Sequence, residues 1–464
     1  MDNCKFLKQK KQVKINGEWV DTRSYRYITY CDGSIPCVVI KGGEPNKKVE
    51  INYFKVNSNP IDCRPKIIYL DDEGNGYAEF ESDDSIYIFK MSQLTHSLEI
   101  EIKGCNVSAF NVTEYQSNIS LTVSCSSYCR QDSFNFFENN SISKLTFKGL
   151  DTSNATSMSF MFSDLDELES LDVSGFDTSK VSNMHRMFYS CHNLKSIKGL
   201  TNFNTSKVTD MYEMFNCCHS LLGPLNLSSW NVSNVTNMEG MFEDCRGITS
   251  LDLSGWNTSS NVTTMELMFS SCRSLKSIKG VNNFDTSKVT NMHAMFSSCQ
   301  SLHSLFLNGW NVSNVTTMEV MFCGCEGIKL LDLSGWNVSN VTNMEWMFDS
   351  CSNLTSLDLS GWNVNNATSM WRMFMLCRSL TSLDLSGWNV SNVANMVLMF
   401  CECNSLTSLD LSGWNLSRPL TTGMFDYCDS LKTIYMRDCS QNTIDIIKYE
   451  LEKSHILGQV TIIT

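Results

Sequence analysis

The residues that could carry out covalent catalysis are scattered along the 464-residue sequence. Its seven histidines are scattered, and two of them directly follow a cysteine, in Cys191-His192 and Cys218-His219. A cysteine nucleophile needs a base in contact with it and a third group that orients the base, which adjacency in sequence does not provide. The sequence contains no Gly-rich phosphate loop and no spaced set of metal ligands. We therefore predict a protein that is not an enzyme and that uses no cofactor or metal.

Residues suited to non-covalent binding are easier to recognise. Trp346, Trp371 and Arg372 bring aromatic area and a cation to positions that no repeating core pattern requires. Tyr212 and Phe306 are similar departures from the pattern. Trp, Tyr and Arg are the side chains that most often anchor an interface. We predict that these five residues contact a ligand on the outer surface.

An acidic column offers a second kind of binding chemistry. Asp332, Asp358, Asp384 and Asp410 occupy equivalent positions in four consecutive copies of a repeat. Neighbouring carboxylates about 5 Å apart in water repel each other by roughly 0.8 kcal/mol. A cation or a basic ligand would relieve that repulsion, and simple solvation of the four side chains is the alternative.

A regular repeat positions all of these residues. A Met-Phe pair returns at intervals of 25 to 27 residues, and a Leu-rich segment accompanies most copies. A fixed period in this range indicates a leucine-rich solenoid, in which short units stack because none can bury its apolar face alone. The elongated surface of a solenoid usually binds other molecules. The eleven pairs begin at Met161, Met187, Met214, Met241, Met268, Met295, Met321, Met347, Met373, Met399 and Met424.

Each unit contains two patterns. Around Leu357, leucines alternate with polar residues, which predicts a short strand with its leucines pointing inward, and Gly361 then turns the chain. The fold class predicted is an α/β repeat, a leucine-rich-repeat solenoid with a parallel sheet and one or two helical turns in each unit. The helical part is inferred from the i, i+3, i+4 and i+7 spacing of Met370, Met373, Phe374 and Cys377.

Three further columns recur in strict register. A Trp follows most of the strands, and we expect it to pack in the core, with a carbohydrate-stacking platform as the alternative. Ten cysteines follow the Met-Phe pairs at one fixed position, where the first copy has Leu165, which indicates small buried thiols rather than disulfides. The third column is expected to form a hydrogen-bonded ladder on neighbouring backbone and includes Asn337, Asn363 and Asn389.

Composition divides the chain into five parts. Residues 1–20 are a basic leader, and residues 21–100 hold short alternating runs that predict a β-rich anchor domain. Residues 101–150 are expected to form the N-terminal cap of the solenoid, and residues 151–430 hold the repeats. Residues 431–464 should form a C-terminal cap with a closing strand and a helix that buries Ile444, Ile447 and Leu451.

The charge balance reverses along the chain. The first seventy residues hold 13 Lys and Arg against 7 Asp and Glu, whereas the whole chain has a net charge of −13. An acidic solenoid is not expected to bind nucleic acid, and the basic leader could contact an acidic neighbour or remain a solvated terminus. No apolar run is long enough for a signal peptide or a membrane helix, so we expect synthesis in a cytoplasm without a signal peptide and without a membrane span.

The repeats resemble the BspA-like leucine-rich repeat family. The stretches LDLSGWNVSNVTNMEWMFDSC and LTSLDLSGWNVSNVANMVLMF match its consensus, and the resemblance covers roughly residues 150–430. It implies a non-enzymatic surface or adhesion role, as in bacterial surface proteins that bind host matrix or other cells. Related repeats also occur in protist surface proteins and in predicted phage proteins. The resemblance implies no catalytic residues.

These observations lead to one functional hypothesis and two alternatives. We predict a non-catalytic adhesion protein that displays its solenoid for host attachment to a cell-surface protein or glycan. Residues 1–100 would bind a structural protein of the same assembly, and the missing signal and basic leader favour a bacteriophage virion, with the protein on the virion surface. One alternative is a bacterial or protist surface adhesin that reaches the bacterial cell surface by a non-standard export route. The other is a purely structural virion protein.

Overall fold

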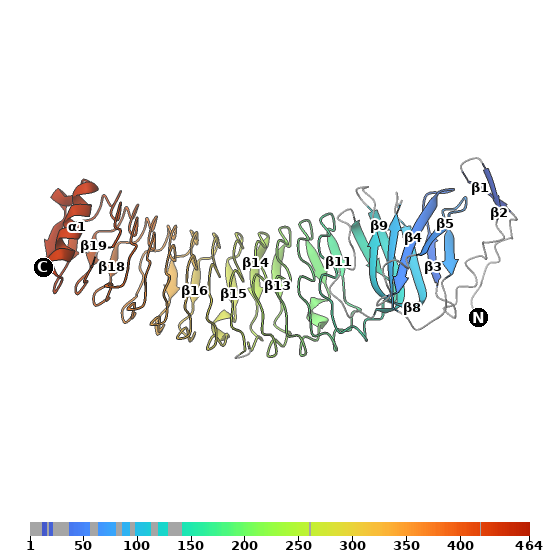
Figure 1. Cartoon of the computed structure of the whole chain (residues 1–464), viewed down its shortest axis with the longest axis horizontal. Helices are drawn as coiled ribbons and strands as arrows, with labels where there is room; N and C mark the ends of the chain where they lie inside the picture. The colour runs from blue at the N-terminus through green and yellow to red at the C-terminus, as the bar shows by residue number, and fades with distance from the viewer. Residues whose placement is uncertain are drawn as a thin grey trace. The chain divides into compact units, whose positions relative to one another are not determined.

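The computed structural model describes most of the chain, which divides into two compact units (Figure 1). The first unit comprises Met1–Val208 and Cys217–Leu221, and the second comprises Thr209–Asn216 and Leu222–Thr464. Most of the predicted basic leader lies outside the described residues. The described residues are 12–15, 18–21, 37–55, 64–79, 86–92, 98–112, 119–128, 142–258, 261–417 and 419–464.

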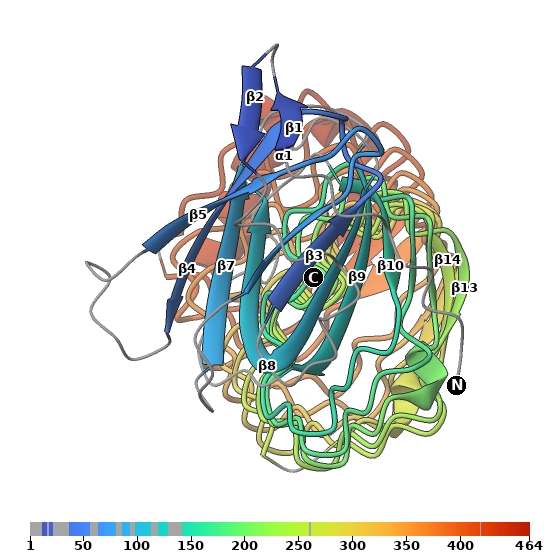
Figure 2. The same cartoon turned by 90° about the vertical axis from the view of Figure 1, so that its right-hand side faces the viewer.

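The first unit contains a short antiparallel pair and an eight-stranded sheet. In the pair, β1 (Gln12–Ile15) lies beside β2 (Glu18–Asp21). The sheet consists of β3 (Cys37–Lys41), β4 (Lys48–Lys55), β5 (Arg64–Tyr69), β6 (Gly76–Glu79), β7 (Ile86–Ser92), β8 (Leu98–Val112), β9 (Ile119–Tyr128) and β10 (Ile142–Phe147). Its order is β10-β9-β8-β7-β4-β5 (Figure 2). The strand β3 pairs with both β6 and β8.

The strand β3 shows why this sheet forms. Cys37, Val38, Val39 and Ile40 are all fully buried, as an unbroken apolar run requires when both faces of a strand are covered. This strand pairs antiparallel with the first part of β8, and β9 pairs parallel with β8. The boundary predicted at residue 100 falls inside β8, so strands of the expected anchor domain and of the expected cap share one sheet.

Short parallel strands follow one another in the repeats of both units. In the first unit, β11 (Ser170–Asp172) and β12 (Ser196–Lys198) place Leu171 beside Ile197. In the second unit, leucine or isoleucine again faces leucine or isoleucine of the next strand, which confirms the predicted parallel solenoid sheet. The strands of the second unit are β13 (Gly223–Asn226), β14 (Ile248–Asp252), β15 (Ser277–Lys279), β16 (Ser304–Phe306), β17 (Leu330–Asp332), β18 (Ser382–Asp384), β19 (Ser408–Asp410), β20 (Thr433–Tyr435) and β21 (Thr461–Ile463).

The second half of each repeat differs from the predicted helical turns. It consists of successive tight turns, and two residues per repeat have a left-handed backbone, with φ 59° at Trp346 and 61° at Ser350 in one copy. The Phe348 N–H donates to the Met373 carbonyl of the next repeat at 2.9 Å rather than to a carbonyl four residues earlier. The helical prediction is wrong because such turns also return apolar residues to one face every three or four positions.

The aromatic side chains form continuous stacks inside the second unit. The ring centroids of Phe322 and Phe348 are 5.7 Å apart with planes at 6°, and those of Trp336 and Trp362 are 6.3 Å apart at 5°. The Trp336 Nε1–H donates to the Leu307 carbonyl at 3.0 Å, which satisfies the polar end of a buried indole. Because Trp362 is only 5% exposed, the Trp column is core, as predicted, and is not a platform for sugars.

The ladder cysteines are buried thiols, as predicted. The Cys351 thiol donates to the Phe322 carbonyl at 3.3 Å, and the equivalent contact recurs along the stack. Burial raises the pKa of the Cys325 thiol to about 12. These thiols therefore act as small apolar groups with one weak hydrogen bond. Cys37, in the N-terminal sheet, is instead disulfide-bonded.

The predicted asparagine ladder lies three residues later than expected. Asn337 accepts a hydrogen bond from the Ser339 N–H at 3.1 Å, so it closes a local turn. The bonds between repeats come from Asn340, whose Nδ2 donates to the Ser313 carbonyl at 2.7 Å, and from Asn366, which donates in the same way to Ser339. The prediction for Asn337 was wrong because an Asn side chain at this position accepts a hydrogen bond from the backbone N–H two residues ahead more easily than it bonds to the backbone of another repeat.

One α-helix lies near the C-terminus of the described chain. This helix, α1 (Gln441–Lys453), begins at Ser440, whose hydroxyl oxygen accepts from the Thr443 N–H, and it buries Ile444, Ile447 and Leu451 as expected. The closing strand β21 pairs parallel with β20. The described residues include the 3₁₀ segments η4 (Leu200–Asn202), η5 (Val281–Asn283) and η6 (Leu457–Gln459). Among the described residues, no helix combines the length and the apolar character needed to cross a membrane.

Candidate binding surface

Trp346, Trp371 and Arg372 meet in the second compact unit. They lie in the turns just before the Met-Phe pairs of two successive repeats, and the Trp346 N–H donates to the Trp371 carbonyl at 2.9 Å. The two indole rings pack edge to face, with centroids 5.2 Å apart and planes at 84°. The guanidinium carbon of Arg372 lies 3.6 Å from the centroid of the Trp346 ring. The structure thus brings together three of the five predicted ligand contacts, here called the aromatic–arginine cluster.

The side chains of the aromatic–arginine cluster are half-buried rather than exposed, which corrects the expectation from sequence. The two indoles and the guanidinium pack on one another, and each covers part of the others' surface. A cation over an aromatic face at a partly exposed site contributes about 0.5–1 kcal/mol. The cluster therefore presents a partly covered surface whose side chains are held by mutual contacts, and such side chains lose little conformational freedom when a ligand binds.

A buried carboxylate holds the arginine in place. Arg372 Nε donates to Asp349 Oδ2 at 3.0 Å, and the Asp349 side chain is 2% exposed against 21% for Arg372. Burial raises the pKa of the Asp349 carboxyl, although a hydrogen bond from Ser350 and the charge of Arg372 act in the opposite direction. Asp349 was absent from the predicted site. The available signal was an acidic residue directly after a Met-Phe pair, one repeat before an arginine.

The other two predicted contacts lie elsewhere. Phe306 ends the strand β16 and is 52% exposed, whereas the cluster lies in the turns of later repeats. Tyr212 is half-buried and has the same repeat position as Trp371, six repeats earlier. The structure therefore joins neither residue to the cluster, and a role for either in binding stays a prediction.

The acidic column is held by its own backbone. In each of the four residues one carboxylate oxygen accepts from the N–H two positions ahead, for example from Ser360 to Asp358 at 2.9 Å. Hydrogen bonds from Ser360 lower the pKa of Asp358. Where the next strand has lysine in this column, an ion pair forms in addition to the backbone bond, as between Asp252 and Lys279 at 3.1 Å. Cation binding stays a prediction for Asp332, Asp358, Asp384 and Asp410.

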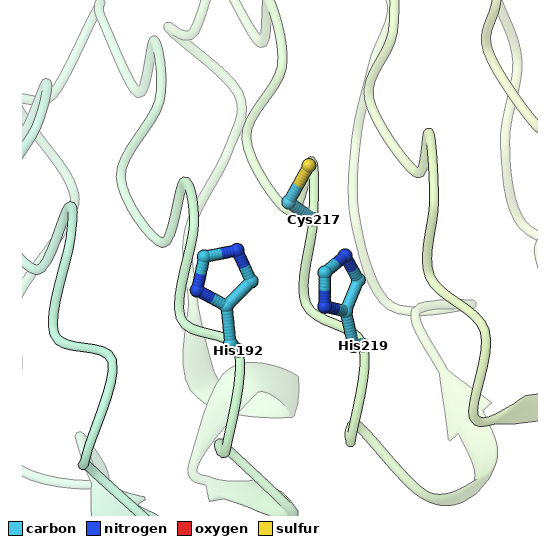
Figure 3. A group of neighbouring side chains, drawn as sticks. All are labelled: His192, Cys217 and His219. Atoms are coloured by element: carbon cyan, nitrogen blue, oxygen red, sulfur yellow. The ribbon is translucent and has the colours of Figure 1, made fainter.

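A second group of side chains was not predicted from the sequence. His192, Cys217 and His219 gather on the first compact unit, and ligand atoms of the three lie within 4.8 Å of one another (Figure 3). In the linear sequence His192 and His219 stand out only as neighbours of Cys191 and Cys218. The available signal was their 27-residue separation, which equals one repeat and therefore places them side by side.

The repeats match a known family. Four overlapping matches cover residues 128–198, 190–279, 275–380 and 323–437, and the family is described as a Mycoplasma protein of unknown function, DUF285. Together the matches span more than half of the chain. The chain belongs to the DUF285 family. Its stacked parallel repeats make this DUF285 protein a leucine-rich-repeat solenoid. No curated protein matches the chain.

Three solved structures show only weak likeness to this DUF285 protein. A Leptospira interrogans leucine-rich-repeat protein is 12% identical with a TM-score of 0.29, over 80% of this chain and 90% of that one. The Drosophila Toll–Spatzle complex is 14% identical with a TM-score of 0.27, over 86% of this chain and 57% of that one. The mouse RP105/MD-1 complex is 13% identical with a TM-score of 0.20, over 77% of this chain and 66% of that one. This chain covers less than two thirds of the matched chain in the last two. At these TM-scores the likeness carries no argument about function.

Proposed function

We propose that this DUF285 protein is a non-catalytic binding protein whose aromatic–arginine cluster contacts a protein or glycan on a cell surface. The observation that carries the proposal is the cluster itself, in which two indoles and a guanidinium are held together beside a buried carboxylate. The repeat does not require these residues, since Trp346 and Arg372 are replaced by Gly240 and Ala294 at the equivalent position of other copies. Aromatic rings and arginine are the preferred anchors of interfaces.

The cellular placement is a further part of this proposal. We favour attachment to host cells from the surface of a bacteriophage virion, with residues 1–100 bound to a structural protein of the virion. The support is the basic balance of the first seventy residues against the acidic remainder. A purely structural virion protein would instead bury the aromatic–arginine cluster against a neighbouring subunit.

The alternative placement is that of a bacterial surface adhesin, and the family description, which names Mycoplasma and no function, supports only the bacterial source that this alternative requires. The resemblance of the repeats to the BspA-like consensus supports the same alternative. The disulfide at Cys37 fits either surface, because disulfides persist in oxidising surroundings. Mass spectrometry of purified virions and of washed cell envelopes separates the two placements, since the protein should be present in only one of them.

Binding by the cluster is tested with the purified full chain on intact cells and on a glycan array. Trp371→Ala should weaken binding by at least about fivefold, which corresponds to more than about 1 kcal/mol for an anchor residue. Arg372→Lys keeps the charge but loses the planar group that stacks on Trp346, so it should also weaken binding. Tyr449→Ala is the matched control, because Tyr449 is 55% exposed and has Lys453 5.3 Å from its ring. Equal binding by Trp371→Ala and Tyr449→Ala would overturn the proposal.

A further inference from the structure

Two histidines and a cysteine converge within the first compact unit (Figure 3). His192 and His219 stack as successive copies of one repeat position, with ring centroids 4.5 Å apart and planes tilted by 36°. Cys217 comes two residues before His219, and Figure 3 shows its side chain above the two rings. All three residues are half-buried. The group is therefore both assembled by the fold and accessible to a small ion.

The backbone fixes the positions of these residues. Cys217 has a left-handed conformation with φ 60°, and its carbonyl accepts from the His219 N–H at 2.9 Å. The Ser220 N–H donates to the His192 carbonyl at 3.1 Å, which joins the two repeats at this point. Adjacent Cys218 points the other way, because it is fully buried and its thiol donates to the Phe188 carbonyl. Cys217 is therefore distinct from the core ladder of thiols.

A carboxylate orients one of the imidazoles. Asp166 Oδ1 lies 2.5 Å from His192 Nδ1, so in the neutral imidazole the carboxylate favours the tautomer with its proton on Nδ1 and its lone pair on Nε2. The Nε2 atom faces the Ser190 hydroxyl at 3.3 Å, a long hydrogen bond that a stronger partner would replace. An imidazole whose second nitrogen donates to a carboxylate is the usual arrangement around protein-bound metal ions.

We propose that His192, Cys217 and His219 bind a late first-row divalent metal ion of the Zn²⁺ type, with Asp166 as the residue that positions His192. Two imidazole nitrogens and one thiolate form a borderline-soft donor set, which suits such ions and does not suit Mg²⁺ or Ca²⁺. Zn²⁺ holds nitrogen at about 2.0 Å and sulfur at about 2.3 Å. The three ligand atoms would close from separations of up to 4.8 Å by rotation of half-buried side chains.

The ion would have two consequences for the protein. Its ligands come from two successive repeats, so it would join them by coordination bonds. Three protein ligands leave the fourth tetrahedral position for water or for a group on a partner. This site lies in the first compact unit and the aromatic–arginine cluster in the second, so the metal proposal does not depend on the proposed function.

Cobalt titration of the reduced full chain tests the ligand set. One equivalent of Co²⁺ should give a thiolate-to-cobalt charge-transfer band and the intense visible bands of four-coordinate cobalt. Cys217→Ser should abolish the charge-transfer band, whereas Cys323→Ser, which removes another half-buried thiol, should retain it. A band that persists in Cys217→Ser would overturn the assignment.

Zinc affinity, measured by competition with a chelator, tests the geometry. Asp166→Asn should weaken Zn²⁺ binding by roughly 10- to 100-fold, as outer partners of metal-bound histidines do, and His192→Gln should weaken it further. His293→Gln is the control, since His293 is a half-buried histidine of another repeat. Zn²⁺ should raise the melting temperature of wild type and of His293→Gln but not of His192→Gln. Unchanged zinc affinity in both His192→Gln and His219→Gln would refute the proposal, even if Cys217→Ser failed to fold.

Discussion

Replacing Arg372 with methionine would leave the Asp349 carboxylate buried without its cation. Methionine keeps an apolar stem of similar length, so the change removes mainly the charge, its hydrogen bond and the guanidinium over the Trp346 ring. A hydrogen bond to a charged group is worth about 1.5–3 kcal/mol, and the cation–π contact adds about 0.5–1 kcal/mol at a partly exposed site. The free energy of unfolding near neutral pH should therefore fall by about 2–4 kcal/mol.

The loss should depend on pH in a direction that the pKa of Asp349 determines. Burial raises this pKa above its ordinary value of 3.8 even with Arg372 present, and removal of the cation raises it further. A folded-state pKa above the unfolded one stabilises the fold at low pH, and this contribution is lost as the pH rises through the folded-state pKa. The difference between wild type and Arg372→Met should therefore be largest near neutral pH and shrink as the pH falls toward about 4.

Urea unfolding followed by circular dichroism at several pH values measures this difference. Arg378→Met is the matched control, because Arg378 Nη2 lies 2.6 Å from Glu402 Oε2 but the two side chains are 55% and 32% exposed. An exposed pair is worth about 0–1 kcal/mol, so the control should lose little stability. The reasoning is refuted if Arg372→Met loses no more than Arg378→Met, or if its deficit grows in acid.

Other parts of the fold give three further expectations. Trp362→Ala should lower the free energy of unfolding by about 3–5 kcal/mol, and a loss below about 1 kcal/mol in urea would contradict the stacked core. At about pH 8 the ten ladder cysteines should react with a thiol reagent only after the protein unfolds, because burial raises the pKa of Cys325 to about 12. Rapid reaction in the native state would show that these thiols are accessible and would contradict the expectation. Ser271→Gly should raise the free energy of unfolding by up to about 1 kcal/mol and with it the melting temperature. The reason is that Ser271 has a left-handed backbone with φ 59°, and Gly324 occupies the equivalent position of another repeat. Ser271→Ala, which keeps the strain, should give no such increase.

The stacked core could be predicted from sequence because its signal is repetition. A constant period determines which side chains align, so the burial of Trp362 and of the ladder cysteines followed without any knowledge of strand pairing. The N-terminal sheet could not be predicted in the same way. There β3 pairs with β6 and β8, and β7 lies parallel to β8. Pairings of this kind depend on contacts between distant segments, which alternating runs do not encode.

The candidate sites were predictable only where a residue departs visibly from the repeat. Trp346, Trp371 and Arg372 are such departures, and the structure brings them together. Asp349 and Cys217 look ordinary in the linear sequence, and they become important through the register between adjacent repeats. Arg372 meets Asp349 at a separation of 23 residues and His192 meets Asp166 at 26. In an alignment of successive repeats, Asp166 and His192 share one column, and Asp349 and Arg372 stand three columns apart.

The misjudged helical turns show where local patterns stop being informative. A helix and a series of tight turns both return apolar side chains to one face every three or four residues, so Met370 and Phe374 fit either. The two differ in where their backbone N–H groups bond. Here they reach the next repeat, as from Phe374 to the Met399 carbonyl at 2.9 Å. Each left-handed non-glycine residue costs about 1–2 kcal/mol, and a helix would avoid that cost. The bonds between repeats and the shared core offset it, so this conformation is a property of the stack rather than of any single repeat.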